Sequence, residues 1–419
     1  MSAQCRPARR TPRRIGTCAI VLCAALPFLS GCATPKRMAA VPAELTTRAS
    51  PLSGHTRFWI GGDPQPLNDE LIAAYRREVA HQASIGQAGP LPPAVYLSVS
   101  GGGDDGAFGA GLLSGWTQQG TRPSFKLVTG VSTGALIAPF AFLGPRYDPI
   151  LRETYTTVTQ KDIFKKRQIT AAIFGDAMAD TAPMYKLVQR YVTRELLDEI
   201  AVEYGKGRLL LVGTTDLDAR RPVIWNMTAI AASRDPRALE LFRKVILASA
   251  AIPAAFPPVM IGVEVDGVRY QEMHVDGGAT AQVFMYPQST NAREMKKAGH
   301  VERKAAVYII RNARLDPGWS MVDRRTLSIA EKAVASLIQT QGLGDLNRIY
   351  LTSLRDGIDY NLAYIPADFT VPRTGDFQPA YMRPLFERGF QMGRQGYPWR
   401  KTPPGYDAPI ETTAEAGAR

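Results

Sequence analysis

Two glycine-rich turns, each between an apolar strand and a helix, constrain the fold of this 419-residue chain most strongly. The β-branched run Ala94–Ser100 predicts a buried strand that ends at Gly101, and Ala107–Gln119 predicts a helix. Phe125–Val131 and Thr133–Leu143 repeat the strand and the helix. Strand, helix, strand and helix at this spacing predict a parallel sheet. We therefore expect an α/β fold with helices on both faces of the sheet.

The rest of the chain predicts further helices and strands. They are a helix at Asn68–Gln82, an amphipathic segment at Tyr185–Tyr204, strands at Arg208–Thr215 and Pro222–Met227, a helix at Pro236–Ala250, a hairpin of Val259–Val265 and Val268–His274, a strand at Ala305–Arg311 and a helix at Leu327–Gln341. From Gly375 the chain is rich in glycine, proline and arginine, and its last residues, about 15 in number, have the composition of a disordered tail.

The first turn, Gly101–Gly106, reads Gly-Gly-Gly-Asp-Asp-Gly and matches the G-x-G-x-x-G pattern of dinucleotide-binding loops. Such a loop requires an acid about 20 residues downstream to hold the ribose. No Asp or Glu lies between Ala107 and Tyr147, and Asp104 and Asp105 would repel a pyrophosphate, so we expect no bound nucleotide. The alternative is an oxyanion hole, because the loop's backbone N–H groups lie next to a helix N-terminus.

The second turn is a G-x-S-x-G sequence, Gly130-Val131-Ser132-Thr133-Gly134, between a strand and a helix. This context is typical of a nucleophile elbow, which exposes the serine hydroxyl at the carboxyl end of the sheet. Gly130 and Gly134 permit the sharp turn that such an elbow needs. The other interpretation is a structural glycine turn, since the chain contains 37 glycines.

A serine nucleophile needs a base, and the chain offers few histidines for that role. His55 and His81 lie upstream of the predicted sheet, and His300 lies in a charged stretch. His274 precedes Asp276 by two residues, so in a strand their side chains point to the same face. Either His274 or Asp276 can therefore act as the base at this stage.

The composition excludes several other kinds of site. All four cysteines lie in the first 32 positions, which excludes a disulfide framework, a cysteine nucleophile or a thiolate metal site in the rest of the chain. The four histidines do not have metal-ligand spacing, so we expect no metal. The absence of basic–aromatic repeats and zinc-finger spacing predicts no nucleic-acid partner.

Residues 1–31 have the pattern of a secretory signal peptide, with five arginines and no acid before the apolar run Ile15–Leu29. Leu29-Ser30-Gly31-Cys32 resembles a bacterial lipobox, in which the cysteine becomes the lipid attachment point. We expect a lipid anchor on Cys32; a plain signal peptide is the alternative. Ala33 after the cysteine resembles lipoproteins of the outer membrane, so we expect a location in the bacterial cell envelope, facing the periplasm.

Three features occur in order: the glycine loop, the elbow around Ser132, and Asp276-Gly277-Gly278. Together they resemble the patatin-like phospholipase family, over about Val95–Phe284. The resemblance implies a three-layer α/β/α sandwich with a mostly parallel sheet. It also implies Ser132 as nucleophile and Asp276 as base in a two-residue dyad, without a cofactor. The implied oxyanion hole consists of the backbone of Gly101, Gly102 and Gly103.

The resemblance implies lipid acyl hydrolysis of the phospholipase A or lysophospholipase kind, with membrane phospholipid or another acyl lipid as substrate. Asp105 departs from the family, which commonly has Arg or Lys there. The alternatives are a general carboxylesterase or thioesterase, and a catalytically silent lipid-binding envelope lipoprotein. Asp105 is the feature that favours the silent binder.

We expect four segments along the chain: a signal peptide at 1–31, a lipid-anchored tether and N-terminal extension at 32–90, a catalytic domain at 91–365, and a C-terminal extension with a disordered tail at 366–419. Residues 145–184 are either a lid over the cleft or a plain insertion. Ile252-Pro253 is expected to break a helix beside the acyl pocket.

Overall fold

A nine-stranded mixed sheet lies at the centre of the computed structural model, which describes residues 36–87, 89–167, 176–293, 303–316, 318–319 and 321–406. The predicted signal peptide, Cys32, His300 and most of the predicted tail lie outside these ranges. Within the described ranges, none of the helices combines the length and the apolar composition that crossing a membrane requires.

The sheet has the strand order β1-β7-β6-β3-β2-β10-β11, and the hairpin β8–β9 joins it through β6. The strands are β1 (Arg57–Trp59), β2 (Ala94–Val99), β3 (Leu127–Val131), β6 (Leu209–Asp216), β7 (Arg221–Asn226), β8 (Val259–Val265), β9 (Val268–Asp276), β10 (Ala305–Arg311) and β11 (Asp359–Tyr364). The five strands from β6 to β11 along this order are parallel, while β7 and β9 run antiparallel to β6.

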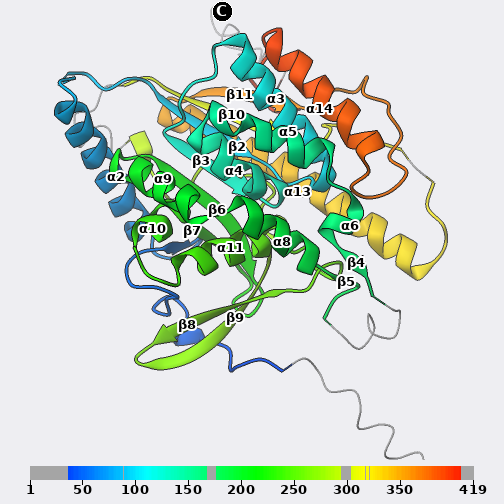
Figure 1. The fold of residues 1–419 in the computed structure, drawn as a ribbon, viewed down its shortest axis with the longest axis horizontal. Helices are drawn as coiled ribbons and strands as arrows, with labels where there is room; N and C mark the ends of the chain where they lie inside the picture. Colours follow the sequence, from blue (N-terminus) through cyan, green and yellow to red (C-terminus); the bar gives the residue numbers. More distant parts are fainter. Residues whose placement is uncertain are drawn as a thin grey trace, which may run out of the picture.

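Helices cover both faces of the sheet and make three layers (Figure 1). One face packs against α3 (Gly106–Gln119), α4 (Thr133–Leu143), α5 (Asp148–Thr156), α8 (Ala182–Tyr191), α9 (Arg194–Gly205), α10 (Met227–Ala232), α11 (Ala238–Ser249) and α14 (Pro379–Arg394). The other face packs against α2 (Gln65–Ser84) and α13 (Thr326–Asp356). The predicted α/β/α fold class is confirmed.

One feature of strand pairing places the carboxyl end of β9 beside the end of β3. Strand β3 ends at Val131, which pairs with Gly213 of β6. Strand β6 continues for three more residues, and β9 pairs with that projecting end, with Asp276 opposite Thr214. The last residue of β9 therefore lies where β3 stops and its following turn begins.

Two predicted elements differ from the structure. The segment Tyr185–Tyr204 forms two helices, α8 and α9, because the Thr193 side chain accepts a hydrogen bond from the Leu196 N–H and caps a new helix. Helix α13 continues 15 residues past the predicted Gln341. Its interior residue Gly342 lies against the Arg311 guanidinium, where a Cβ would come within 2.1 Å of Nη1.

Two elements near the C-terminus, β11 and α14, were not predicted. Helix α14 packs along α3 (orange beside cyan in Figure 1), and the backbones approach closely at glycines of both helices. A Cβ on Gly111 of α3 would lie 2.0 Å from the Phe386 carbonyl oxygen, and one on Gly389 of α14 would lie 2.3 Å from that of Phe108. The predicted C-terminal extension thus contributes to the same core as α3.

The close approach of α3 and α14 predicts the effect of adding one methyl group. Gly111→Ala should lower the free energy of unfolding by about 2 kcal/mol or more, since the Cβ would overlap backbone of α14 and force the helices apart. Urea denaturation measures this loss. The control is Gly344→Ala in α13, where the nearest atom to a Cβ is 3.6 Å away and alanine should be neutral or stabilising. Equal stability of the two variants would contradict this packing.

Candidate active site

Ser132 lies in the turn between β3 and α4 with φ of +55°, a conformation that non-glycine residues rarely adopt. Such strain costs on the order of 1–3 kcal/mol and needs support from the surroundings. The Ser132 N–H donates to Ser249 Oγ at 3.0 Å, and Ser249 Oγ donates to the Gly213 carbonyl at 2.7 Å. Ser249 therefore anchors the strained turn to β6.

The two glycines of the elbow are required by close backbone contacts. A Cβ on Gly130 would lie 2.4 Å from the Gly134 carbonyl oxygen, and one on Gly134 would lie 2.2 Å from the Val99 carbonyl oxygen. These contacts explain the G-x-S-x-G spacing, because only hydrogen atoms fit between the turn and the neighbouring strand β2.

Asp276 lies at the end of β9, and the Ser132 hydroxyl is close enough to its carboxyl group to lower the pKa of that group. The Asp276 Oδ1 accepts the Gly278 N–H at 2.7 Å, and the Asp276 N–H donates to the Ala251 carbonyl at 2.9 Å. Gly277 passes so close to Gly213 that a Cβ on Gly277 would lie 2.4 Å from the Gly213 carbonyl oxygen. The predicted nucleophile and the predicted base thus lie close together.

Burial controls the charge of this carboxyl group. Asp276 is 5% exposed, and this burial raises its pKa to about 7, although the hydrogen bonds from Ser132 and Gly278 act in the opposite direction. A carboxylate with a pKa near neutrality is a better proton acceptor than an ordinary aspartate. The pair can therefore transfer the serine proton at neutral pH.

The glycine loop that follows β2 lies beside the serine: a Cβ on Gly101 would be 3.1 Å from that of Ser132. Gly102 and Gly103 have φ of +155° and +60°, and Gly102 touches the backbone of Asn312. The Gly101 N–H donates to the Gln282 carbonyl at 3.1 Å, so this donor is already used. In the described ranges the N–H groups of Gly102 and Gly103 donate no hydrogen bond, so these two are available as the predicted oxyanion donors.

Side chains that the sequence did not single out hold this loop. The Asn312 side chain accepts the Gly109 N–H at 3.1 Å and donates to the Ser100 carbonyl at 2.9 Å. Gln282 holds the Gly101 N–H through its carbonyl, and its side chain donates to the Gly278 carbonyl at 2.9 Å. Gly106, at the start of α3, lies against Thr133. The only signal for Asn312 in the sequence is its place after β10.

An apolar pocket lies between α4, α5 and α8, and Thr133, the residue after Ser132, is part of its lining. It is lined by Thr133, Leu136, Pro139, Phe140, Thr154, Tyr155, Val158, Ile163, Met184, Leu187, Val188, Tyr191, Val192, Ile246, Phe377 and Met382. Part of the segment predicted as a lid or an insertion thus forms a wall of the pocket. Ile252 and Pro253 lie past the end of α11, as predicted, and Ile252 is exposed.

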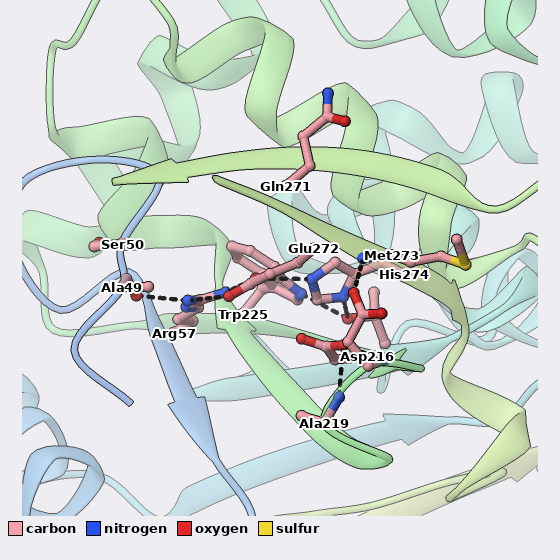
Figure 2. A network of polar contacts seen from close by, with 12 residues as sticks. Ala49, Ser50, Arg57, Asp216, Ala219, Trp225, Gln271, Glu272, Met273 and His274 are labelled. Carbon is pink, nitrogen blue, oxygen red and sulfur yellow. Dashed lines mark hydrogen bonds and ion pairs between the residues drawn. The ribbon is translucent and has the colours of Figure 1, made fainter. Parts of the chain in front are cut away.

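His274 belongs to a different polar network, drawn in Figure 2. Its Nε2 lies 3.1 Å from Glu272 Oε2, and its Nδ1 lies 3.0 Å from Thr214 Oγ1. Arg57 of β1 donates to the same glutamate from both terminal guanidinium nitrogens, Nη1 and Nη2, and also donates to the Ala49 carbonyl. Among the described residues no hydrogen bond joins His274 to Ser132, so the geometry favours Asp276 as the base.

The ligand atoms of Asp216, Glu272 and His274 lie within 4.8 Å of one another, a spacing that can hold a metal ion. Burial would raise the pKa of Glu272, but its bonds to His274 and Arg57 outweigh burial and lower it to about 2. Asp216 accepts the N–H groups of Asp218 and Ala219 in the turn after β6. With both Glu272 oxygens bound to Arg57, this cluster fits an ion-pair network that links β9 to β1 better than a metal site.

A comparison with models of protein families agrees with the sequence resemblance. The family model described as patatin-like phospholipase matches residues 97–285. A comparison with curated protein sequences finds no match. Among solved structures, VipD from Legionella pneumophila is similar at 12% identity with a TM-score of 0.31, covering 73% of this chain and 66% of VipD. The type III effector protein ExoU is similar at 15% identity with a TM-score of 0.27, covering 73% of this chain and 53% of ExoU.

The raised pKa of Asp276 predicts the pH dependence of ester cleavage. Because the base must be unprotonated to accept the Ser132 proton, kcat/KM for a soluble ester such as nitrophenyl butyrate should rise with pH through about 7 and then level off. Asp105, whose pKa burial raises to about 6, also titrates in this range, so the profile should be repeated with Asp105→Asn. A step near 7 in both proteins is expected; a flat profile from about pH 5 to 8 would contradict the assignment.

Proposed function

We propose that this chain is a serine acyl hydrolase that cleaves ester bonds of membrane lipids, because the model of the patatin-like phospholipase family matches residues 97–285. The observation that carries the proposal is the contact between Ser132 and a buried Asp276, with the N–H groups of Gly102 and Gly103 beside the serine. A nucleophile, a base and oxyanion donors are the three parts that acyl transfer needs.

In the proposed reaction, Ser132 Oγ attacks the ester carbonyl carbon while its proton moves to Asp276. The carbonyl oxygen becomes negative, and the N–H groups of Gly102 and Gly103 stabilise it. Collapse of this intermediate breaks the carbon–oxygen bond of the ester, and the leaving alcohol takes the proton from Asp276. The carboxylate then removes a proton from water, which attacks the carbonyl carbon of the acyl-serine. The bond from this carbon to Ser132 Oγ breaks, Asp276 returns the proton to Ser132 Oγ, and the fatty acid is released.

The apolar pocket supports a lipid substrate. Its lining comes almost entirely from apolar side chains and includes Thr133, the residue after the nucleophile. We expect an acyl chain placed there to have its carbonyl carbon near Ser132. Burial of each methylene group contributes about 0.8 kcal/mol to binding.

Two other functions are compatible with parts of this site. A carboxylesterase or thioesterase would use the same dyad on short acyl groups. A lipid-binding protein without activity would keep the pocket, and the two acids of the glycine loop, Asp104 and Asp105, favour this alternative because they lie near the predicted oxyanion. The contact between Ser132 and Asp276 favours a hydrolase over the silent binder.

We further propose that Cys32 carries a lipid anchor and that residues 1–31 are removed, which would hold the enzyme at the outer membrane, facing the periplasm. These residues lie outside the described part of the structure, so the support is the sequence alone. Mass spectrometry of protein purified from bacterial envelopes tests this proposal. An unmodified Cys32, or an intact peptide bond between residues 31 and 32, would contradict it.

Removing either member of the dyad should abolish or strongly reduce hydrolysis. Ser132→Ala should leave no turnover above background, and Asp276→Asn should lower kcat by about 100-fold or more, since it keeps the shape of the base but not its proton affinity. The assay follows fatty acid released from phospholipid vesicles and, in parallel, cleavage of a short soluble ester. Ser336→Ala and Asp316→Asn, both on the surface, are the matched controls.

Each outcome of this assay distinguishes the candidates, provided that thermal unfolding shows folded protein. Normal turnover by Ser132→Ala or Asp276→Asn would exclude the dyad. Cleavage of the short ester without release of fatty acid from vesicles would favour the general esterase. No turnover of either substrate by the wild-type protein, together with no covalent labelling by a fluorophosphonate, would favour the silent lipid binder.

A further inference from the structure

The glycine loop carries two acids in a place where negative charge is unfavourable for the proposed reaction. Asp104 and Asp105 directly follow Gly103, one of the two predicted oxyanion donors. Asp104 is completely buried, and burial raises its pKa. An uncompensated carboxylate here would oppose the charge that develops on the carbonyl oxygen, because charges interact strongly in a water-poor site.

A segment more than 260 residues further along the chain approaches both acids. Arg373 Nη2 lies 3.0 Å from Asp104 Oδ1, and the Phe377 N–H donates to Asp104 Oδ2 at 2.9 Å. The Tyr381 hydroxyl donates to Asp105 Oδ1 at 2.5 Å. Three groups of one segment thus hold both carboxylates of the loop.

Arg373 is the source of positive charge at this place. Among the described residues it is the cation whose charge lowers the pKa of both Asp104 and Asp105. Burial would lower the pKa of the Arg373 guanidinium, but attraction to these two acids and to Asp376 outweighs burial and raises it. The arginine is thus held in its charged form between the loop and the start of α14.

The same segment forms part of the substrate pocket. Phe377 and Met382 line the apolar pocket, and the Phe377 ring packs edge-on against Phe164 at a centroid distance of 6.4 Å. Phe377 has φ of +50°, which is unusual for a bulky residue and shows that its position is fixed by its surroundings. The segment therefore contacts the predicted oxyanion loop and the predicted acyl pocket together.

We propose that Arg373 is a positioning residue for the reaction: its ion pair with Asp104, together with the Tyr381 hydrogen bond to Asp105, neutralises the loop and holds the Gly102 and Gly103 N–H groups toward the oxyanion. This inference rests on the proposed hydrolase function. It assigns a catalytic support role to the C-terminal segment, and it explains how the loop can tolerate two acids.

The test compares Arg373→Gln with Arg373→Lys, which keeps the charge, and with Arg394→Gln, an exposed arginine on the same C-terminal region as the matched control. Arg373→Gln should lower kcat for ester hydrolysis by about tenfold or more while KM changes little, because the loss falls on the transition state. The rate of inactivation by a fluorophosphonate should fall in parallel. Arg373→Lys should retain kcat within about threefold, and Arg394→Gln should match the wild type.

A double variant tests whether the arginine acts through Asp104. Asp104→Asn combined with Arg373→Gln removes both charges, so kcat should recover to within about threefold of the wild type. In this double variant position 104 carries no buried charge, and Asp105 keeps the hydrogen bond from Tyr381, so the test stays usable if Arg373→Gln does not fold. A double variant with kcat as low as that expected for Arg373→Gln would overturn the inference, as would wild-type kcat in folded Arg373→Gln.

Failure of this inference differs from failure of the proposed function. If the wild type hydrolyses esters through Ser132 and Arg373→Gln is equally active, only the role of Arg373 is wrong. If the wild type is inactive and indistinguishable from Ser132→Ala, the hydrolase function itself is wrong.

Discussion

The active-site geometry depends on how two strands share one edge of β6. Strand β3 pairs with β6 as far as Gly213 and then turns into the elbow, while β9 pairs with the projecting end of β6 and places Asp276 opposite Thr214. Ser249 ties the strained Ser132 to the Gly213 carbonyl at the point where one strand replaces the other. Backbone hydrogen bonds between strands therefore bring the serine and the aspartate to the same place at the end of the sheet.

A network of buried charges stabilises the position of β9, the strand that ends at Asp276. The Arg57–Glu272–His274 network fixes β9 to β1 four residues before Asp276, and removing one member would leave a buried charge unpaired at a cost of about 3–5 kcal/mol. Near the serine the opposite holds: in the part of the chain that the structure describes, no cation pairs with Asp276, and burial raises its pKa. The fold thus separates the ion-paired carboxylate of Glu272 from that of Asp276, the proposed proton acceptor.

Much of the fold, and the proximity of Ser132 to Asp276, could be predicted from the sequence. Strand β10 and helix α4 have the predicted bounds, because apolar periodicity and glycine turns are local signals. Helix α14 was missed since its glycines, which weaken helix propensity, are needed for contact with α3. The roles of Asn312, Gln282 and Arg373 could not be read from the sequence, because each depends on contacts between segments far apart along the chain. The hydrogen bond from the Gly101 N–H to the Gln282 carbonyl could not be predicted for the same reason.

The most direct measurement of the central claim is a crystal structure of the protein after reaction with a long-chain alkyl phosphonate, which imitates the charged intermediate. The account predicts a phosphorus atom bonded to Ser132 Oγ, with the phosphoryl oxygen about 3 Å from the N–H groups of Gly102 and Gly103. The alkyl chain should occupy the apolar pocket between α4, α5 and α8, whose lining includes Thr133. An adduct on another residue, or a phosphoryl oxygen turned away from the glycine loop, would contradict the account.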